Sequence, residues 1–179
     1  MGMSSPVVLN LVRYQCAWFA TVLGAAGSHE WLGDLIAVFM IGLHIRQAPS
    51  PRTEIRTILA ILLIGALWEF GVVQLKIVAY RFSYAIIGVP VWILLLWAAF
   101  ATTLNGCLGW LRERLLLASL LGGILGPLSW YGGAKLNALT VPAGLSGYLF
   151  LGFGWLFLMP VLSRLALYFD KAEGLRRGV

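Results

Sequence analysis

Long apolar runs dominate the chain and leave few structures open to it. Six runs are separated by turn-forming residues and occupy 6–26, 31–45, 57–78, 89–108, 115–134 and 145–166. Most are close to the roughly 20 residues that a helix needs to cross a bilayer. Only 11% of the residues are charged, whereas a soluble domain carries about a quarter. We therefore predict an all-α, polytopic membrane protein with a bundle of about six transmembrane helices.

The connections between the runs are short. Turn-forming residues separate the runs at Pro49 to Pro51, 81–90, Gly109 and 137–142. No linker is long enough to join a second domain, so we expect one transmembrane domain over residues 1–179. A short basic tail at 167–179 follows the last run.

The first run could be mistaken for a cleaved leader, because the small residues from Gly24 to Ser28 follow it. A secretory leader has a basic beginning and an uninterrupted apolar centre. Here the basic segment is missing and Arg13 interrupts the run. We expect residues 6–26 to stay as the first span.

Basic residues divide unequally between the two predicted faces of the membrane. One face receives Lys76, Arg81 and Lys135, and the other receives Arg13, Arg46, Arg52, Arg56, Arg112, Arg114, Arg164, Lys171, Arg176 and Arg177. Loops rich in Lys and Arg stay in the cytoplasm, which predicts a multi-pass protein with cytoplasmic N- and C-termini. Because topology accounts for the net charge of +6, we expect the lipid bilayer, and no nucleic acid, as a partner.

Small residues recur on one face of the fifth run. In lipid, helices approach closely where their contact faces carry Gly, Ala or Ser. The fifth run therefore predicts a helix-packing seam with a bend at its proline, formed by Gly122, Gly123, Gly126, Pro127 and Gly133. The first run predicts a similar seam at Ala17, Ala20, Thr21 and Gly24.

Glu69 is the strongest candidate for chemistry. It lies near the middle of the run 57–78, where an ionisable side chain is costly unless it is paired or hydrated. Gly65 and Ala66 precede it by one turn, which favours a neighbouring helix on this face, and Lys76 follows seven residues later on nearly the same face. We expect Glu69 to face the bundle and to border a cavity. It is either a paired carboxylate that fixes packing or a ligand or proton site.

A second polar group falls on the predicted cytoplasmic half. It contains Asn10, Arg13, Gln15, His44, Thr102 and Asn105. Asn10 and Arg13 share one helix face, and Thr102 and Asn105 share another. We predict that these residues, apart from the interfacial His44, bind a ligand together with Glu69. Alternatively, Arg13 extends to the lipid headgroups.

No metal, cofactor or catalytic motif is evident. His29, Glu30 and Asp34 form a small acidic group without a second ligand motif, so pairing with a basic side chain or hydration is favoured. Cys16 and Cys107 lack metal-ligand spacing and indicate small buried apolar residues. The sequence predicts no catalytic residues, no metal and no cofactor.

Three stretches carry a family resemblance. They are Pro90 to Trp92, Leu96 to Asn105 with Gly109 to Leu111, and Leu121 to Leu136, and Asn10, Gln15 and Trp18 fit the beginning of the pattern. The chain resembles a family of small bacterial inner-membrane proteins that is described as a domain of unknown function. The resemblance implies a bacterial cytoplasmic membrane location. The family pattern often has His where this chain has Gly106, and Asp where it has Glu69, so the carboxylate is kept but acid–base catalysis is less favoured.

Three functions remain open at this stage. The buried carboxylate favours a protein that binds or translocates a lipid or small amphiphile near Glu69. A structural or accessory subunit with a membrane-protein partner is the alternative. An intramembrane lipid-modifying enzyme is the least favoured, because no catalytic motif is present and the loops are short.

Overall fold

The computed structural model describes residues 5–82 and 84–177 and is built from helices. The α-helices are α1 (Ser5–Ala26), α2 (Glu30–Gln47), α3 (Pro51–Gln74), α4 (Val91–Asn105), α5 (Leu115–Lys135) and α6 (Leu145–Arg177). A 3-10 helix, η1 (Gly109–Leu111), lies between α4 and α5. The predicted all-α class is confirmed.

Within residues 5–82 and 84–177, four helices are long and apolar enough to cross a membrane, judged by length and composition. They are α1, α3, α5 and α6, with apolar spans at Pro6–Ala26, Pro51–Gln74, Leu115–Lys135 and Leu145–Ala172. α2 has 18 residues, including Glu30, Asp34 and Arg46. α4 has 15 residues and is about 22 Å long, shorter than the roughly 30 Å hydrocarbon core. The chain is thus suited to a membrane, and the bundle of about six spans that the sequence predicts stays a prediction.

The end residues of α4 explain why it is shorter than the predicted run at 89–108. Val89 and Pro90 form strand β3, which pairs antiparallel with β2 (Ala85–Ile86). At the other end, Gly106 leaves the helical conformation with φ −100° and ψ −115°. The apolar pattern continues beyond both ends, so hydrophobicity alone could not locate them. The predicted tail at 167–179 also differs, because α6 stays helical to Arg177.

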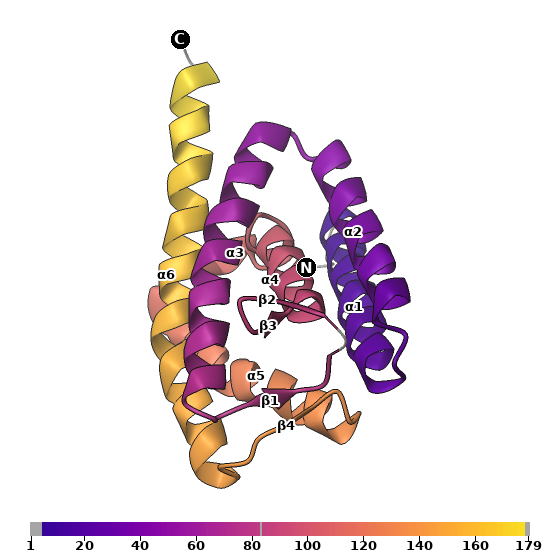
Figure 1. Cartoon of the computed structure of the whole chain (residues 1–179). Helices are drawn as coiled ribbons and strands as arrows, with labels where there is room; N and C mark the ends of the chain where they lie inside the picture. The colour runs from indigo at the N-terminus through magenta and orange to yellow at the C-terminus, as the bar shows by residue number, and fades with distance from the viewer. Residues whose placement is uncertain (1–4, 83, 178–179) are drawn as a thin grey trace.

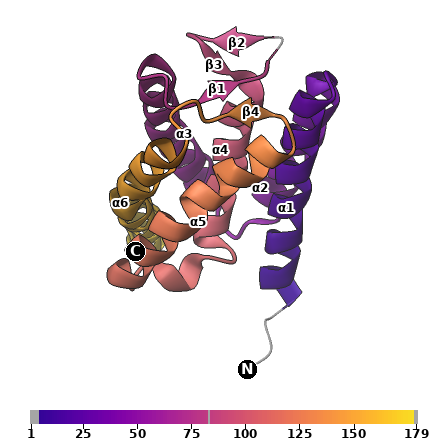
Figure 2. The ribbon, with the colours of Figure 1, turned by 90° about the horizontal axis from the view of Figure 1, so that it is seen from below.

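α4 lies at the centre of the fold (Figure 1). The α1–α2 pair packs on one side of α4 and α3 on the other, while α5 and α6 pack against each other. Seen from below, α5 crosses in front of α4, with α1 on one side and α6 on the other (Figure 2). Strand β1 (Ala79–Tyr80) pairs antiparallel with β4 (Leu139–Thr140), which joins the segment after α3 to the segment after α5.

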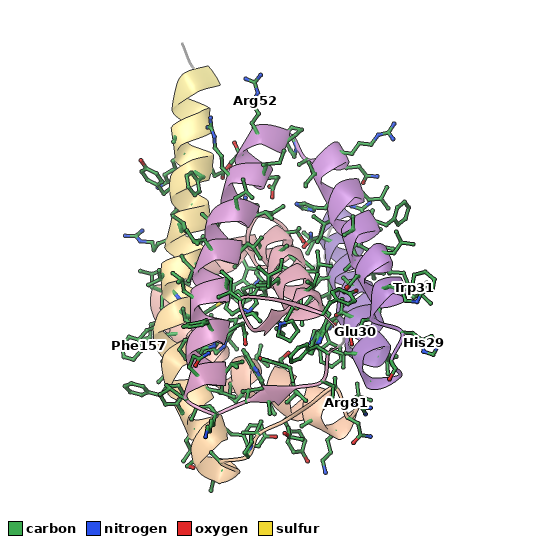
Figure 3. All side chains as sticks on the ribbon, viewed as in Figure 1. His29, Glu30, Trp31, Arg52, Arg81 and Phe157 are labelled. Carbon is green, nitrogen blue, oxygen red and sulfur yellow. The ribbon has the colours of Figure 1, made fainter. Side chains whose placement is uncertain are left out.

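The turns gather at two opposite ends of the molecule. The α2–α3 turn lies at the same end as the C-terminal part of α6, and the α1–α2 turn, β1 and β4 lie at the other (Figure 1). Arg52 and Arg81 accordingly lie at opposite ends (Figure 3). Arg52 belongs to the larger of the two groups of basic residues that the sequence distinguishes, and Arg81 belongs to the smaller one.

The outer helix faces are apolar, as a surface in contact with lipid requires. On α3, Leu59, Leu63 and Leu67 follow at intervals of four residues and are 59%, 63% and 66% exposed. The opposite face of the same helix buries Ile58, Ile61 and Glu69. Such a large exposed apolar area is unusual for a soluble monomer.

The glycines of α5 meet α6 at close range. A Cβ atom added to Gly122 would lie 2.4 Å from Met159 Cβ, and one added to Gly126 would lie 2.5 Å from Trp155 Cγ. Gly123 faces α6 in the same way, through Leu156 Cδ2 at 2.5 Å, and the Pro127 ring lies near Gly152. The predicted seam differs at Gly133, which faces Leu139 in the following segment.

The first predicted seam also lies at a helix pair. A Cβ atom on Gly33 of α2 would lie 2.3 Å from the Ala20 carbonyl oxygen and 3.0 Å from Thr21 Cα. Gly24 packs against the start of α2, where its added Cβ would lie 3.5 Å from Glu30 Cα. Small residues on α1 therefore face a glycine on α2.

Candidate functional site

Glu69 is fully buried, with none of its surface exposed. Its Oε1 atom accepts a hydrogen bond from Trp97 Nε1 at 2.7 Å, and its Oε2 atom accepts one from the Tyr80 hydroxyl at 2.5 Å. Trp97 comes from α4, and Tyr80 comes from β1, which the chain reaches after α3 ends. Gly65 allows this approach, because a Cβ atom there would lie 2.2 Å from the Trp97 ring.

The donors around Glu69 point in one direction. Trp130 Nε1 donates to the Tyr80 hydroxyl oxygen at 2.8 Å. Indole N–H groups can only donate, so the Tyr80 oxygen is occupied as an acceptor and its own proton points to Glu69. Burial, followed by the neighbouring Glu69 charge, holds the pKa of the Tyr80 hydroxyl well above its usual range. Tyr80 therefore keeps its proton, and the arrangement fits an ionised carboxylate.

This geometry corrects two details of the sequence interpretation. α3 ends at Gln74, and Lys76 lies beyond it with a positive φ of 55°. The seven-residue spacing therefore does not place Lys76 on the face of Glu69, and Lys76 is exposed. The partners of Glu69 are neutral aromatic donors, which the sequence analysis did not identify.

A cavity of about 530 Å³ borders Glu69. Pockets for small molecules have volumes of roughly 300–1,000 Å³ and mostly apolar walls with a few polar groups. The wall here is built from α1, α4, α5 and α6 around the Glu69 side chain of α3, and it includes Leu11, Tyr14, Gln15, Trp18, Trp92, Trp97, Phe100, Leu125, Ser129, Trp130, Trp155 and Met159. Of the predicted ligand-binding residues, Glu69 and Gln15 line this cavity.

One side of the cavity lies between α1 and α5. Leu11 and Phe19 of α1 are 37% and 51% exposed, and Leu125 and Leu128 of α5 are 56% and 53% exposed, yet all four line the cavity. α1 packs mainly on α2 and α4, and α5 packs mainly on α6. The cavity therefore reaches the apolar outer surface between the two helices. Across this side, Trp18 Nε1 donates to Ser129 Oγ at 3.0 Å.

Trp155 contributes an unmatched donor to the cavity wall. Its side chain is 7% exposed and stacks on Trp97, with ring centroids 5.3 Å apart. Among the described residues, its indole nitrogen has no hydrogen-bond partner. A buried donor without an acceptor costs about 1–3 kcal/mol.

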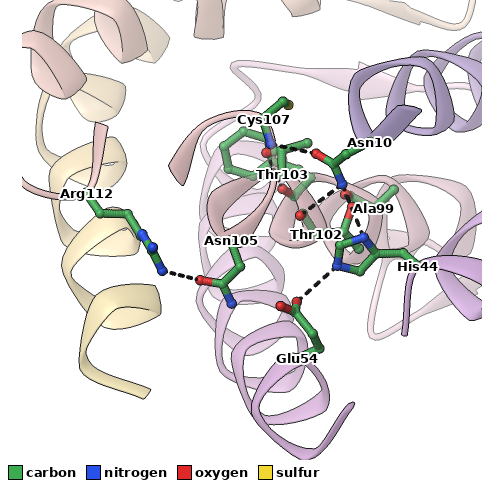
Figure 4. Close-up of polar contacts among 10 residues, drawn as sticks. Asn10, His44, Glu54, Ala99, Thr102, Thr103, Asn105, Cys107 and Arg112 are labelled. Carbon is green, nitrogen blue, oxygen red and sulfur yellow. Dashed lines mark hydrogen bonds and ion pairs between the residues drawn. The ribbon is translucent and has the colours of Figure 1, made fainter. Parts of the chain in front are cut away.

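Asn10 organises a second site at the ends of several helices (Figure 4). Its Oδ1 atom accepts from the Cys107 backbone N–H at 2.8 Å, and its Nδ2 atom donates to the Thr102 carbonyl oxygen at 3.2 Å. The same nitrogen lies 3.2 Å from His44 Nδ1. Gly106 is required for this contact, because a Cβ atom there would lie 2.2 Å from Asn10 Oδ1.

The Asn10 amide also determines the tautomer of His44. Since Asn10 Nδ2 is a donor, His44 Nδ1 must accept, and the ring proton then lies on Nε2. His44 Nε2 is 3.1 Å from Glu54 Oε2 and donates to it. These contacts join α1, α2, α3 and the end of α4, and they fit a structural clamp.

The other members of the predicted cytoplasmic group separate. Arg13 donates to Gln47 at 2.6 Å near the surface. Asn105 accepts from Arg112 Nη1 at 2.9 Å, and Arg112 also pairs with Asp170 of α6 at 3.0 Å. The structure thus brings Asn10, Thr102 and His44 together, but not Arg13, Gln15 or Asn105. Residues that the sequence places at the same depth in the membrane, but on different helices, are therefore not all in contact.

The acidic group at the start of α2 has an aromatic partner. The Tyr84 hydroxyl donates to Asp34 Oδ2, and His29 is exposed. In the described residues, no group of three or more His, Cys, Asp or Glu side chains is placed to hold a metal ion.

The two cysteines differ in burial. Cys107 is buried as predicted, but Cys16 is exposed on the outer apolar face of α1. An apolar residue that faces lipid and one that faces protein have the same hydrophobicity, so the sequence pattern could not distinguish them.

The four long apolar helices and the apolar cavity define the class: an all-α membrane protein with a buried carboxylate beside a cavity. The chain belongs to the family described as "Protein of unknown function (DUF2878)", whose model matches residues 7–161. The predicted membership of a family of unknown function is thus confirmed. No curated protein and no solved structure matches the chain.

Proposed function

We propose that the cavity binds or translocates a lipid or small amphiphile taken from the bilayer. The observation that carries this proposal is the cavity of about 530 Å³ with Glu69 in its wall. A ligand that enters between α1 and α5 would leave its apolar chain among Leu11, Leu125 and Leu128. Its polar end would reach the aromatic donors and the carboxylate inside.

The composition of the wall supports an amphiphile over a water-soluble substrate. Most of the lining side chains are aliphatic or aromatic, and the polar ones, such as Gln15, Ser129 and Glu69, are few. A sugar or nucleotide would lose its hydration without gaining enough hydrogen bonds. An acyl chain gains from the same wall, by about 0.8 kcal/mol for each methylene buried.

Blocking the outer side of the cavity is expected to weaken binding. Leu125→Trp places a larger side chain at this side, whereas Ile124→Trp places the same side chain next to it, outside the lining. Leu125 and Ile124 are 56% and 58% exposed, so they are matched in burial. Leu125→Trp should exclude about two methylenes of the ligand from the cavity and so weaken binding roughly tenfold, whereas Ile124→Trp should leave the affinity unchanged.

Native mass spectrometry of the delipidated protein, with defined amphiphiles added back, measures this difference. Equal binding by the two variants and the parent would contradict the proposal. If the spectra show a second membrane protein bound to the chain and no bound amphiphile, the role of a structural or accessory subunit replaces the proposed binding function.

We further propose that the chain lies in the bacterial cytoplasmic membrane, with both termini in the cytoplasm. The support is the charge bias of ten basic residues against three, together with the positive-inside rule. In this topology α2 and α4 complete the bundle beside the four longer spans. The end of the molecule that carries Arg52 would face the cytoplasm and the end that carries Arg81 the opposite side.

Reporter fusions test this orientation. Alkaline phosphatase is active only after export, so a fusion after Val179 should be inactive. A fusion after Asn137, in the segment between α5 and α6, should be active. The reverse pattern would overturn the orientation but not the fold.

A further inference from the structure

We infer that the ligand of this cavity is a cationic amphiphile, whose positively charged amine supplies the counter-ion for Glu69. The inference rests on the proposed function and deepens it, because it names the polar end of the ligand. Three observations carry it: the orientation of the donors at Glu69, the lack of a basic residue at the site, and the position of the cavity.

The donors at Glu69 favour the charged form of the carboxylate. Trp97 and Tyr80 each donate to one of its oxygens, and Trp130 fixes the direction of the Tyr80 proton. Trp97 can only donate, and the Tyr80 hydroxyl already donates to Glu69 and accepts from Trp130, so these partners suit a carboxylate that accepts at both oxygens. Hydrogen bonds lower the cost of a buried negative charge but do not neutralise it.

The protein supplies no positive charge to this carboxylate within the described residues. The Arg112–Asp170 ion pair and the contact between His44 and Glu54 lie elsewhere. The lining of the cavity contains no Lys, Arg or His. An isolated charge in a low-dielectric interior attracts an opposite charge strongly, even across several ångströms.

The cavity is placed to receive that opposite charge. It extends from Glu69 to the outer surface between α1 and α5, and aromatic rings such as Tyr14, Trp18 and Phe100 line it. Aromatic rings attract organic ammonium groups, which lose less hydration energy than small ions do.

The same wall disfavours the anionic head groups of common lipids. Phosphate and carboxylate groups are bound through Arg, Lys and clustered N–H donors. This cavity offers a carboxylate in place of a basic side chain. A lipid phosphate would therefore have to stay outside, at the membrane surface.

A head-group series tests the inference in the purified full chain. Dodecyltrimethylammonium, dodecanol and dodecanoate share one apolar chain and differ in charge, and their affinities can be measured by titration in a neutral maltoside detergent. The Leu125→Trp variant, measured in parallel, corrects for partition into the micelle. We expect the ammonium compound to bind at least about tenfold more tightly than dodecanol, with dodecanoate the weakest.

Variants of Glu69 assign the preference to this residue. Glu69→Gln should reduce the preference for the ammonium compound to less than about threefold while dodecanol still binds, and Glu69→Asp should keep the preference. Equal binding of the three compounds by the parent protein would overturn the inference, as would a preference that survives Glu69→Gln. The ranking in the parent protein decides the matter even if a Glu69 variant does not fold. If none of the compounds binds, the proposed function fails as well.

Discussion

Gly126→Leu is expected to destabilise the protein by about 3 kcal/mol, because it forces a branched side chain into the α5–α6 contact. The Cβ atom alone would lie 2.5 Å from Trp155 Cγ and 2.9 Å from its two neighbouring ring atoms. The Trp155 ring is held against Trp97 and cannot move aside freely. Thermal unfolding in detergent should show a melting temperature lower by roughly 6–12 °C.

Gly42→Leu is the matched control for this prediction. Gly42 lies in α2, and a Cβ atom there meets nothing within 4 Å. Both variants make the same change of side chain and helix propensity, so their difference reports packing. Equal melting temperatures for the two variants would show that the α5–α6 contact is not a stabilising seam.

Glu69→Leu is expected to cost about 2–6 kcal/mol, because it leaves two buried donors without an acceptor. The donors are Trp97 Nε1 and the Tyr80 hydroxyl. Glu69→Gln should cost less, about 1–3 kcal/mol. The change is not neutral, because one of the two donors then faces the amide nitrogen. Denaturant titration in mixed micelles should give the largest free energy of unfolding for the parent, a smaller one for Glu69→Gln and the smallest for Glu69→Leu.

A double variant separates hydrogen bonding from packing in this prediction. Trp97→Phe removes one donor and keeps an aromatic ring, so Glu69→Leu should cost less in that background by about 1–3 kcal/mol. A simple sum of the two single effects would mean that Trp97 and Glu69 are not coupled. A Glu69→Leu variant as stable as the parent would contradict the hydrogen-bonded arrangement itself.

The sequence was sufficient to locate the helices whose hydrophobicity stops at a turn. The runs predicted at 6–26 and 115–134 became Ser5–Ala26 and Leu115–Lys135, because Gly27 and Ser28, and Asn137 with its neighbours, interrupt the apolar pattern. The limits of α4 were less accurate. Its flanking residues are as apolar as the helix, and the backbone at Pro90 and Gly106 decides where it ends.

The partners of Glu69 could not be predicted in the same way. Helical periodicity assigns residues to a face of their own helix, but does not say which helix covers that face. Tyr80 reaches Glu69 because the chain changes direction after α3. The helix ends at Gln74, Lys76 adopts a positive φ, and the following strand β1 pairs antiparallel with β4. The available signal was chemical: Tyr and Trp side chains combine a ring that packs in apolar surroundings with a group that donates a hydrogen bond.

The central position of α4 has a consequence for biogenesis. Ten of its 15 residues are buried within the protein, among them Trp92, Leu96, Trp97 and Leu104, so little of its surface is left to face lipid. The α1–α2 and α5–α6 pairs are neighbours in sequence and can associate as soon as each has been synthesised. α4 gains most of its contacts from α1, α2 and α3, which precede it. The main partners of α4 are therefore already synthesised when α4 leaves the ribosome, and α4 itself joins α3 to the α1–α2 pair.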